Sequence, residues 1–308
     1  MRLPKLNSWQ SGTLVFLAAG LLFSLYFKGL MWEPNLHAPT FGGDGLTIHY
    51  NLQYHATYGE GVYLESQYYP HQESVFMTDA QALAAVVLAG LRPVFPHIGQ
   101  YATGISNVLI FWSSPLAALL LFLIFRRLGV RWSLSFLFGC LIAMMSPQII
   151  RQLGGQYTLG FTFLLPLVAW YQLAYDGGKK YWLKSILVAL TVIIIGLNNP
   201  YLYAVASALL MGAAGMGILL KLTGLVRLPW NQLLQWIGVT LASTVVIALT
   251  LAAFDQVDDR VEVPFGFFHN LSLIHIRRCR RPTLSSPCTS PLHYTLPSPH
   301  PQRHTLTL

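Results

Sequence analysis

The stretch WLKSILVALTVIIIGLNNPYLYAVASALLMGAAGMGILL, residues 182–220, decides the fold class. It is 39 residues long and contains one charged side chain, Lys184. A membrane-spanning helix needs about 20 mainly apolar residues, so this stretch is too long for a single crossing. Asn198, Asn199 and Pro200 interrupt it, because proline cannot continue a helix and asparagine favours turns. The stretch therefore predicts two membrane-spanning helices joined by a tight turn.

Similar apolar runs occur along most of the chain. Of its 308 residues, 54% are hydrophobic and 10% are charged, and the mean hydropathy is +0.51. Soluble domains carry about 25% charged residues, and disordered chains lack this apolar content. Three cysteines are too few for a disulfide scaffold. The sequence predicts an all-α, polytopic transmembrane bundle of about seven helices, near 14–32, 106–125, 132–150, 159–175, 182–197, 201–220 and 233–254.

Positive charges in the short loops predict how these helices are oriented. Ten Lys and Arg residues fall on the side of the N-terminus and three on the other side, with every loop alternating correctly. Because positively charged loops stay in the cytoplasm, we expect a cytoplasmic N-terminus. Residues 33–105, 151–158, 198–200 and those after 254 then face outward.

The first outer loop, 33–105, is far longer than ordinary connections, and we expect it to be partly helical and functional. Its residues 80–94 are mostly Ala, Val and Leu, which predicts a helix lying on the membrane surface. Ten of the eleven acidic residues face outward, and only Asp176 faces inward. This asymmetry indicates either a metal- or phosphate-handling site outside or an ordinary solvated outer surface.

The chain changes character near residue 270. Residues 273–308 contain six prolines, five arginines and no acidic residue, which is typical of a basic, disordered tail. Residues 271–281, however, resemble translated sequencing-adapter DNA. We therefore expect the N-terminal part of a membrane domain in 1–270 and a non-native, disordered segment in 271–308. Before residue 273 the chain has fourteen Lys and Arg against eleven Asp and Glu, so its charge gives no reason to expect a nucleic-acid partner.

A first candidate site residue is Asp44, which follows the first predicted helix within the sequence Gly42-Gly43-Asp44-Gly45. The glycines would let a ligand approach the backbone closely. An aspartate here could act as a general base or bind a divalent cation. The same residues are also typical of a tight turn in a solvated loop.

A second region, residues 68–79, contains Glu73 and Asp79, which could join Asp44 in a carboxylate cluster. His71 could ligate a metal or move a proton. Alternatively, Thr78 or Asp79 could serve as the N-cap of the surface helix expected from residue 80 onward.

Two further regions lie at outer ends of predicted helices. Arg151 precedes a Gly-Gly turn, where its guanidinium could grip a phosphate or anchor the helix at the membrane interface. Asn199 and Tyr201 could bind sugar hydroxyls, or could simply form the turn between two helices. All four regions are expected on the same side of the membrane.

These motifs, in this order, resemble those of the GT-C-type polytopic membrane glycosyltransferases, and within them the YfhO-like group of bacterial proteins. The resemblance covers about residues 10–265. It is carried by Gly43-Asp44-Gly45, Tyr69-Pro70-His71-Gln72-Glu73, Thr78-Asp79, Pro147…Arg151…Gly155-Gln156-Tyr157 and Asn199-Pro200-Tyr201.

The resemblance implies an enzyme of the bacterial inner membrane that takes sugar from a polyprenyl-phosphate donor, in cell-envelope glycan or lipid modification. It implies that Asp44 is catalytic, with a divalent cation as a possible partner, and that Arg151 holds the lipid phosphate. The residues implied to bind the substrate are Glu73, Asp79, Arg151, Gln156, Tyr157, Asn199 and Tyr201. Two positions depart from the pattern, because histidine is expected at Gln156 and often at Asn199. Their neutral amides can bind a sugar but cannot transfer protons.

Two other functions remain open. A polar-lipid transporter or flippase should have ionisable residues inside its helices and often an internal repeat. A non-catalytic multi-pass membrane protein would need none of the outer-loop carboxylates. The predicted helix interiors are nearly free of charge, apart from Lys28 near one end, and this favours the glycosyltransferase.

Overall fold

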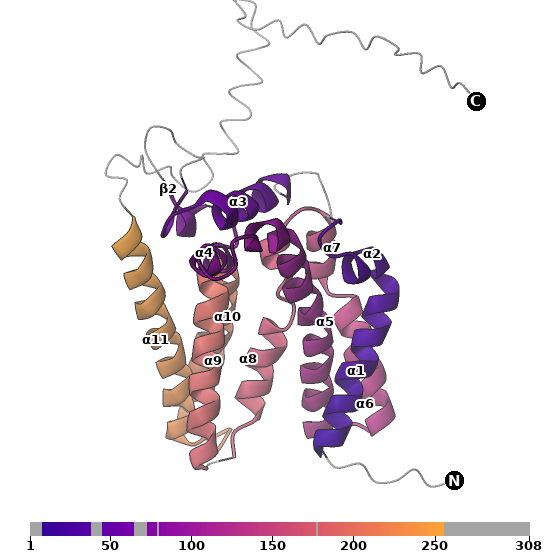
Figure 1. Ribbon diagram of the computed structural model, residues 1–308. Coiled ribbons are helices and arrows are strands. Elements are labelled where there is room, and N and C mark those ends of the chain that lie inside the picture. Colours follow the sequence, from indigo (N-terminus) through magenta and orange to yellow (C-terminus); the bar gives the residue numbers. More distant parts are fainter. Residues whose placement is uncertain (1–7, 38–44, 65–72, 79, 177, 256–308) are drawn as a thin grey trace, which may run out of the picture. The chain divides into compact units, whose positions relative to one another are not determined.

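The computed structural model describes residues 8–37, 45–64, 73–78, 80–176 and 178–255. Within these residues the chain is an all-α bundle with one two-stranded ribbon, which confirms the predicted fold class (Figure 1). The upright helices in Figure 1 are α1 (Ser8–Tyr26), α5 (Ala102–Arg127), α6 (Trp132–Met144), α8 (Leu164–Leu173), α9 (Lys179–Asn198), α10 (Pro200–Leu222) and α11 (Trp230–Phe254).

Shorter helices lie at one end of the upright ones, which we call the α3/α4 end (Figure 1). They are α2 (Lys28–Trp32), α3 (Gly45–Tyr58), α4 (Ala82–Leu91) and α7 (Pro147–Leu153). The ribbon pairs β1 (Tyr63–Leu64) with β2 (Glu73–Ser74) in antiparallel register. Three 3₁₀ turns complete the fold: η1 (Val75–Met77), η2 (Ile98–Tyr101) and η3 (Tyr157–Gly160).

Five stretches of the described chain are long and apolar enough to cross a membrane, which indicates a multi-pass membrane protein. They are Ile98–Arg127, Trp132–Arg151, Lys180–Asn198, Pro200–Leu222 and Trp230–Phe254. The other two predicted spans form shorter helices. The apolar part of α1 runs over Gln10–Tyr26, and α8 has only 10 residues.

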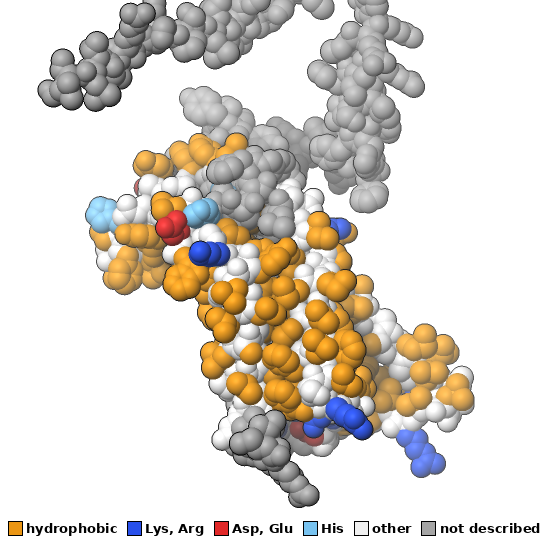
Figure 2. Space-filling view, turned by 90° about the vertical axis from the view of Figure 1, so that its right-hand side faces the viewer, with side chains coloured by type: hydrophobic (Ala, Val, Ile, Leu, Met, Phe, Trp, Pro, Cys, Tyr) orange, Lys and Arg blue, Asp and Glu red, His pale blue; other side chains and the backbone are white. Residues whose placement is uncertain are grey.

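The basic loops lie at one end of the bundle, as predicted from the alternation of basic and non-basic loops along the chain. Since neighbouring upright helices run in opposite directions, the loops after α5, α8 and α10 lie at the same end as the start of α1 (Figure 1). We call this the basic end. Figure 2 shows a broad hydrophobic surface along the bundle, with Lys and Arg at its lower end. The described basic residues there are Arg126, Arg127, Arg131, Lys180, Lys184, Lys221 and Arg227.

The break in the stretch 182–220 lies where the sequence predicts it. Helix α9 ends at Asn198 and α10 begins at Pro200. Asn199 is the N-cap of α10, and its Oδ1 accepts hydrogen bonds from the backbone N–H of Tyr201 (2.9 Å) and Leu202 (3.2 Å). Proline at the first helical position has no backbone N–H, so no donor is left unpaired at that position.

The surface helix expected from residue 80 begins two residues later, as α4. Its N-cap is Gln81, which adopts φ +50° and makes no side-chain cap. Thr78 does not cap the helix, because its hydroxyl donates to the Val75 carbonyl at 2.9 Å. Instead, the Asn198 Oδ1 accepts from the Ala84 N–H at 3.2 Å, so the end of α9 supplies a cap for α4.

The predicted span 159–175 is helical only in α8. Pro166 lies in the first turn of α8, where a proline is tolerated but stops the helix from extending backwards. The non-helical backbone before it is buried and hydrogen-bonded by α5. The Ser113 Oγ donates to the Gly160 carbonyl at 3.2 Å and accepts from the Phe163 N–H at 3.3 Å. Non-helical backbone at membrane depth requires such protein partners.

Hydrophobic packing forms three clusters. One joins α8, α9, α10 and α11 with Ile48 of α3 and Tyr157 of η3. A second lies between α1, α5 and α6, and a third lies under α3 and around α4. The face of α3 that contains Ile48, Leu52 and Ala56 is buried against the bundle. The first cluster therefore connects the α3/α4 end with the long helices.

Candidate functional site

A cavity of about 260 Å³ lies at the α3/α4 end, where α7, η3, α8 and α10 meet. It brings together Arg151 and Tyr201, two sequence-predicted site residues that are 50 positions apart. Both side chains are exposed, Tyr201 to 63%. The remaining lining residues are Pro147, Gln148, Leu159, Leu165, Leu202 and Val205. The cavity thus combines one cation and one phenol with a mainly apolar wall.

The position of Arg151 is set by the way α7 ends. The Gly154 N–H bonds the Ile150 carbonyl at 2.9 Å, and the Gln156 N–H bonds the Arg151 carbonyl at 2.8 Å. The residue enclosed by these bonds, Gly155, has φ +98°, which glycine adopts without steric cost. The Gly-Gly turn therefore stops α7 two residues after Arg151 and leaves its guanidinium at the helix end.

The position of Tyr201 is set by the cap of α10. Asn199 is only 9% exposed, and its side-chain oxygen is occupied by the two N–H groups that it caps. Asn199 therefore orients the first turn of α10, which carries Tyr201 into the cavity wall. The lining of the Arg151 cavity does not include Asn199.

A second cavity of about 390 Å³ adjoins the first and shares Pro147, Gln148 and Leu165 with it. Its wall is formed by α5, α6, the start of α7 and the chain around α8. The other lining residues are Ala117, Leu121, Ile142, Ala143, Met145, Ser146, Thr162 and Pro166. The two cavities therefore lie next to each other, and the second extends along the broken segment before α8.

The neighbours of Arg151 in the motif point in different directions. Gln156 is exposed, whereas Tyr157 is fully buried. The Tyr157 ring packs edge-on against the His49 ring, with 4.3 Å between the centroids. Tyr157 therefore joins η3 to α3 through packing, and neither residue is part of the Arg151 cavity lining.

The predicted carboxylates are only partly described. Glu73 lies in β2, is 4% exposed and does not line the Arg151 cavity. Asp44, Asp79 and His71 lie outside the described residues. Within the described ranges, no three His, Cys, Asp or Glu residues come together in a group suited to a metal ion.

Comparison with known proteins gives a family. A family model described as a domain of unknown function (DUF6311) matches residues 16–274, which is more than half of the chain. The chain belongs to the DUF6311 family. No curated protein and no solved structure matches it.

His49 in α3 is a buried side chain of this DUF6311 chain that is not among the predicted site residues. It is 8% exposed, and both ring nitrogens are buried without a hydrogen-bond partner in the described structure. Burial lowers the pKa of His49, so the ring is neutral at pH 7. The available signal was its spacing: His49 lies on the same side of α3 as Leu52 and Ala56.

His55, six residues further along α3, is also buried in this DUF6311 chain. Its Nε2 lies 3.2 Å from the Gly61 carbonyl, and Arg92 donates to the nearby Thr57 carbonyl at 2.7 Å. Burial, reinforced by the Arg92 charge, lowers the pKa of His55, and the hydrogen bond to Gly61 partly opposes this shift. These contacts tie the end of α3 to the chain around it.

Proposed function

We propose that the DUF6311 chain is a membrane glycosyltransferase that uses a polyprenyl-phosphate-linked sugar, with its site at the α3/α4 end. We further propose that this end faces outward from the bacterial inner membrane, since the basic end matches the cytoplasmic side under the positive-inside rule. The GT-C resemblance suggests the reaction, and the cavities supply independent physical support.

The observation that carries the proposal is the Arg151 cavity with a second, mainly apolar cavity next to it. A polyprenyl phosphate has an anionic head and a long apolar tail. The Arg151 guanidinium offers a forked set of donors for the phosphate. The adjoining apolar cavity, between α5, α6 and α8, offers a path for the first isoprene units. Tyr201 lies where its phenol can donate to a sugar or phosphate oxygen.

In the proposed reaction, an acceptor hydroxyl oxygen attacks the anomeric carbon of the donor sugar. The new carbon–oxygen bond forms as the bond to the phosphate oxygen breaks, which inverts the anomeric centre. The hydroxyl proton passes to the Asp44 carboxylate, and the polyprenyl phosphate leaves with its negative charge paired to Arg151. Glu73, Asp79 and Gln156 stay predicted contacts of the substrate.

No step is assigned to a metal ion. The described residues give no suitable ligand group, and the carboxylates of Asp44 and Asp79 lie outside them. A divalent cation at Asp44 stays a prediction from the sequence.

The test is the variant Asp44→Asn, assayed as the full chain in membrane vesicles. The donors are undecaprenyl phosphates carrying radiolabelled glucose, galactose, mannose or arabinose, with envelope extract as acceptor. We expect the wild type to transfer label from at least one donor. The rate of transfer by the variant should be lower by about 100-fold or more, as when a general base is removed. Asp44 directly precedes α3, and asparagine caps helices as well as aspartate does, so a lost cap cannot explain that result.

Transfer that is undiminished in Asp44→Asn would rule out this carboxylate as the base. A wild type that transfers none of the four sugars would contradict the proposal as a whole. Glu60→Gln is a matched control for the loss of a carboxylate, because Glu60 is exposed and follows α3 at the same end of the bundle.

A polar-lipid transporter is the second candidate. The broken segment before α8 favours it, because discontinuous helices often line transporter sites. A transporter would move undecaprenyl phosphate between the leaflets of a vesicle without transferring sugar. Neither the wild type nor Asp44→Asn would then form any sugar-transfer product.

A further inference from the structure

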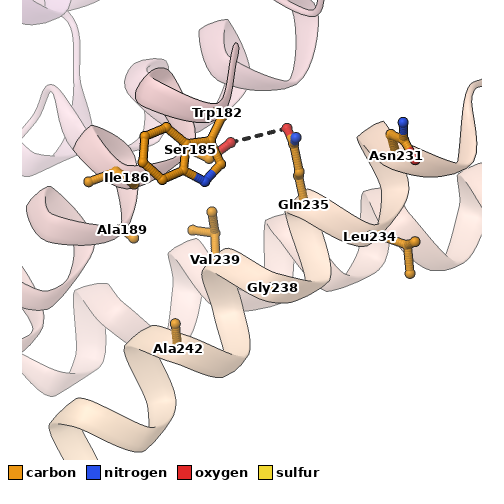
Figure 3. A pocket seen from close by; sticks show the side chains of 10 residues that line it. All are labelled: Trp182, Ser185, Ile186, Ala189, Asn231, Leu234, Gln235, Gly238, Val239 and Ala242. Carbon is orange, nitrogen blue, oxygen red and sulfur yellow. Dashed lines mark hydrogen bonds between the residues drawn. The ribbon is translucent and has the colours of Figure 1, made fainter. Parts of the chain in front are cut away.

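A groove of about 450 Å³ lies between α9 and α11, on the part of both helices nearest the basic end (Figure 3). Helix α9 contributes Trp182, Ser185, Ile186 and Ala189, and α11 contributes Asn231, Leu234, Gln235, Gly238, Val239 and Ala242. None of these residues lines the Arg151 cavity.

The length of the groove matches one leaflet of a bilayer. On α11 the lining runs from Asn231 to Ala242, which at 1.5 Å per residue is about 16 Å. The hydrocarbon core of a bilayer is about 30 Å thick, so the groove extends about halfway across it. Its deep half is apolar, with Ala189, Val239 and Ala242 in its wall. This half fits an acyl chain.

The shallow half of the groove contains the polar side chains of Ser185 and Gln235. Ser185 is 8% exposed, and its Oγ lies 2.7 Å from the Tyr171 hydroxyl, 3.0 Å from the Tyr181 carbonyl and 3.2 Å from the Gln235 Oε1. Figure 3 shows the Gln235 amide turned toward Ser185. Gln235 is half-buried, so its amide can also reach a polar ligand atom in the groove, such as an ester carbonyl.

Basic side chains lie at the same end of the bundle as the shallow half of the groove, although none of them is part of its lining. Lys180 lies in the first turn of α9. The Lys221 Nζ donates to the Leu228 carbonyl and lies over the Trp230 ring, 4.6 Å from its centroid. Trp182 and Trp230 are amphipathic side chains of the kind that lie at headgroup level. Basic pockets at the cytoplasmic ends of membrane helices attract anionic lipid headgroups.

We propose that the α9/α11 groove binds one anionic phospholipid of the leaflet at the basic end. Its acyl chain lies along Ala189, Gly238 and Ala242, its ester group lies beside Gln235, and its phosphate lies among the basic side chains at the basic end. The proposal does not depend on the glycosyltransferase function, because the groove and the Arg151 cavity have no lining residue in common.

The test blocks the groove with Gly238→Leu. A Cβ added at Gly238 meets no atom within 4 Å, so the leucine can occupy the groove without distorting α11. Gly212→Leu is the matched control, since a Cβ at Gly212 in α10 is equally unobstructed and lies away from the groove. The full chain is released from nanodiscs of equal phosphatidylglycerol and phosphatidylcholine, and its bound lipids are counted by native mass spectrometry.

We expect one phosphatidylglycerol to stay bound to the wild type and to Gly212→Leu, at least fivefold enriched over phosphatidylcholine. Gly238→Leu should lose this enrichment. Equal retention of the two lipids by the wild type, or unchanged enrichment in Gly238→Leu, would overturn the proposal. Displacement of the phosphatidylglycerol by an equal amount of undecaprenyl phosphate would also overturn it, because the groove would then be a polyprenyl site.

Discussion

Asn198 and Asn199 share one turn but stabilise different helices. Asn198 accepts from the Ala84 N–H of α4, and its Nδ2 donates to the Ile194 carbonyl at 2.9 Å. Asn199 caps α10. The sequence predicts the turn itself from Pro200, but the bond to α4 joins residues 114 positions apart and has no local signal.

Asn199→Ala tests the structural role of this residue. Losing an N-cap costs about 1 kcal/mol, so the free energy of unfolding in mixed detergent micelles should fall by about that amount. Asn199→Ser restores a capping oxygen and should recover most of it. If the serine variant is as unstable as the alanine variant, the cap is not the cause.

His49 gives a prediction about acid stability. Because the pKa of His49 is lowered in the folded state, the unfolded chain binds more protons below its own pKa of about 6.5. Stability therefore falls as the pH drops through that value, and His55 acts in the same direction. His49→Phe removes one of these groups and leaves no unpaired ring nitrogen. We therefore expect it to change the free energy of unfolding little at pH 7. Between pH 7 and 5 its loss of unfolding free energy should be shallower than in the wild type. Parallel curves would show that His49 does not titrate in this way.

Residue type alone does not determine whether a side chain faces a cavity or a core. The sequence predicts Arg151 and Tyr201 as site residues at helix ends, and both line one cavity. Tyr157 belongs to the same motif but is buried against His49. Whether a tyrosine faces a cavity or a core depends on the neighbouring helix, which a local motif does not contain.

At the scale of elements, α7 and α8 explain where the cavities lie. The sequence predicts one span over 159–175, because its residues are apolar. The structure divides this region into η3, a non-helical turn and α8, since the hydroxyl of Ser113 on α5 pairs with its backbone. Hydropathy reports the apolar surroundings but not this tertiary hydrogen bonding.

Gly155→Ala tests the end of α7. At φ +98° an alanine is strained, and we expect the free energy of unfolding to fall by about 1–2 kcal/mol. Gly154→Ala is the neighbouring control, since Gly154 has no positive φ and the nearest atom to its added Cβ is the Ile150 carbonyl oxygen at 3.4 Å. Equal losses in the two variants would contradict the assignment of the turn to Gly155.

At the scale of the whole molecule, the alternation of basic and non-basic loops predicts which loops share an end of the bundle. In the structure the basic loops lie together at the basic end. The proposed direction across the membrane rests on the positive-inside rule alone. Cysteine labelling tests it in a background with Cys279 and Cys288 changed to serine, while Cys140 is buried. A membrane-impermeant maleimide should label Tyr58→Cys in intact cells and Thr223→Cys only after permeabilisation. The reverse pattern would invert the proposed topology.

The central claim is that the Arg151 cavity holds a polyprenyl phosphate. The most direct measurement is the affinity of the full chain in detergent micelles for undecaprenyl phosphate, compared between the wild type, Arg151→Gln and the charge-matched Arg227→Gln. A charged hydrogen bond contributes about 1.5 kcal/mol or more, so Arg151→Gln should raise the dissociation constant at least about tenfold, while Arg227→Gln leaves it unchanged. Equal affinity in all three proteins would contradict the account.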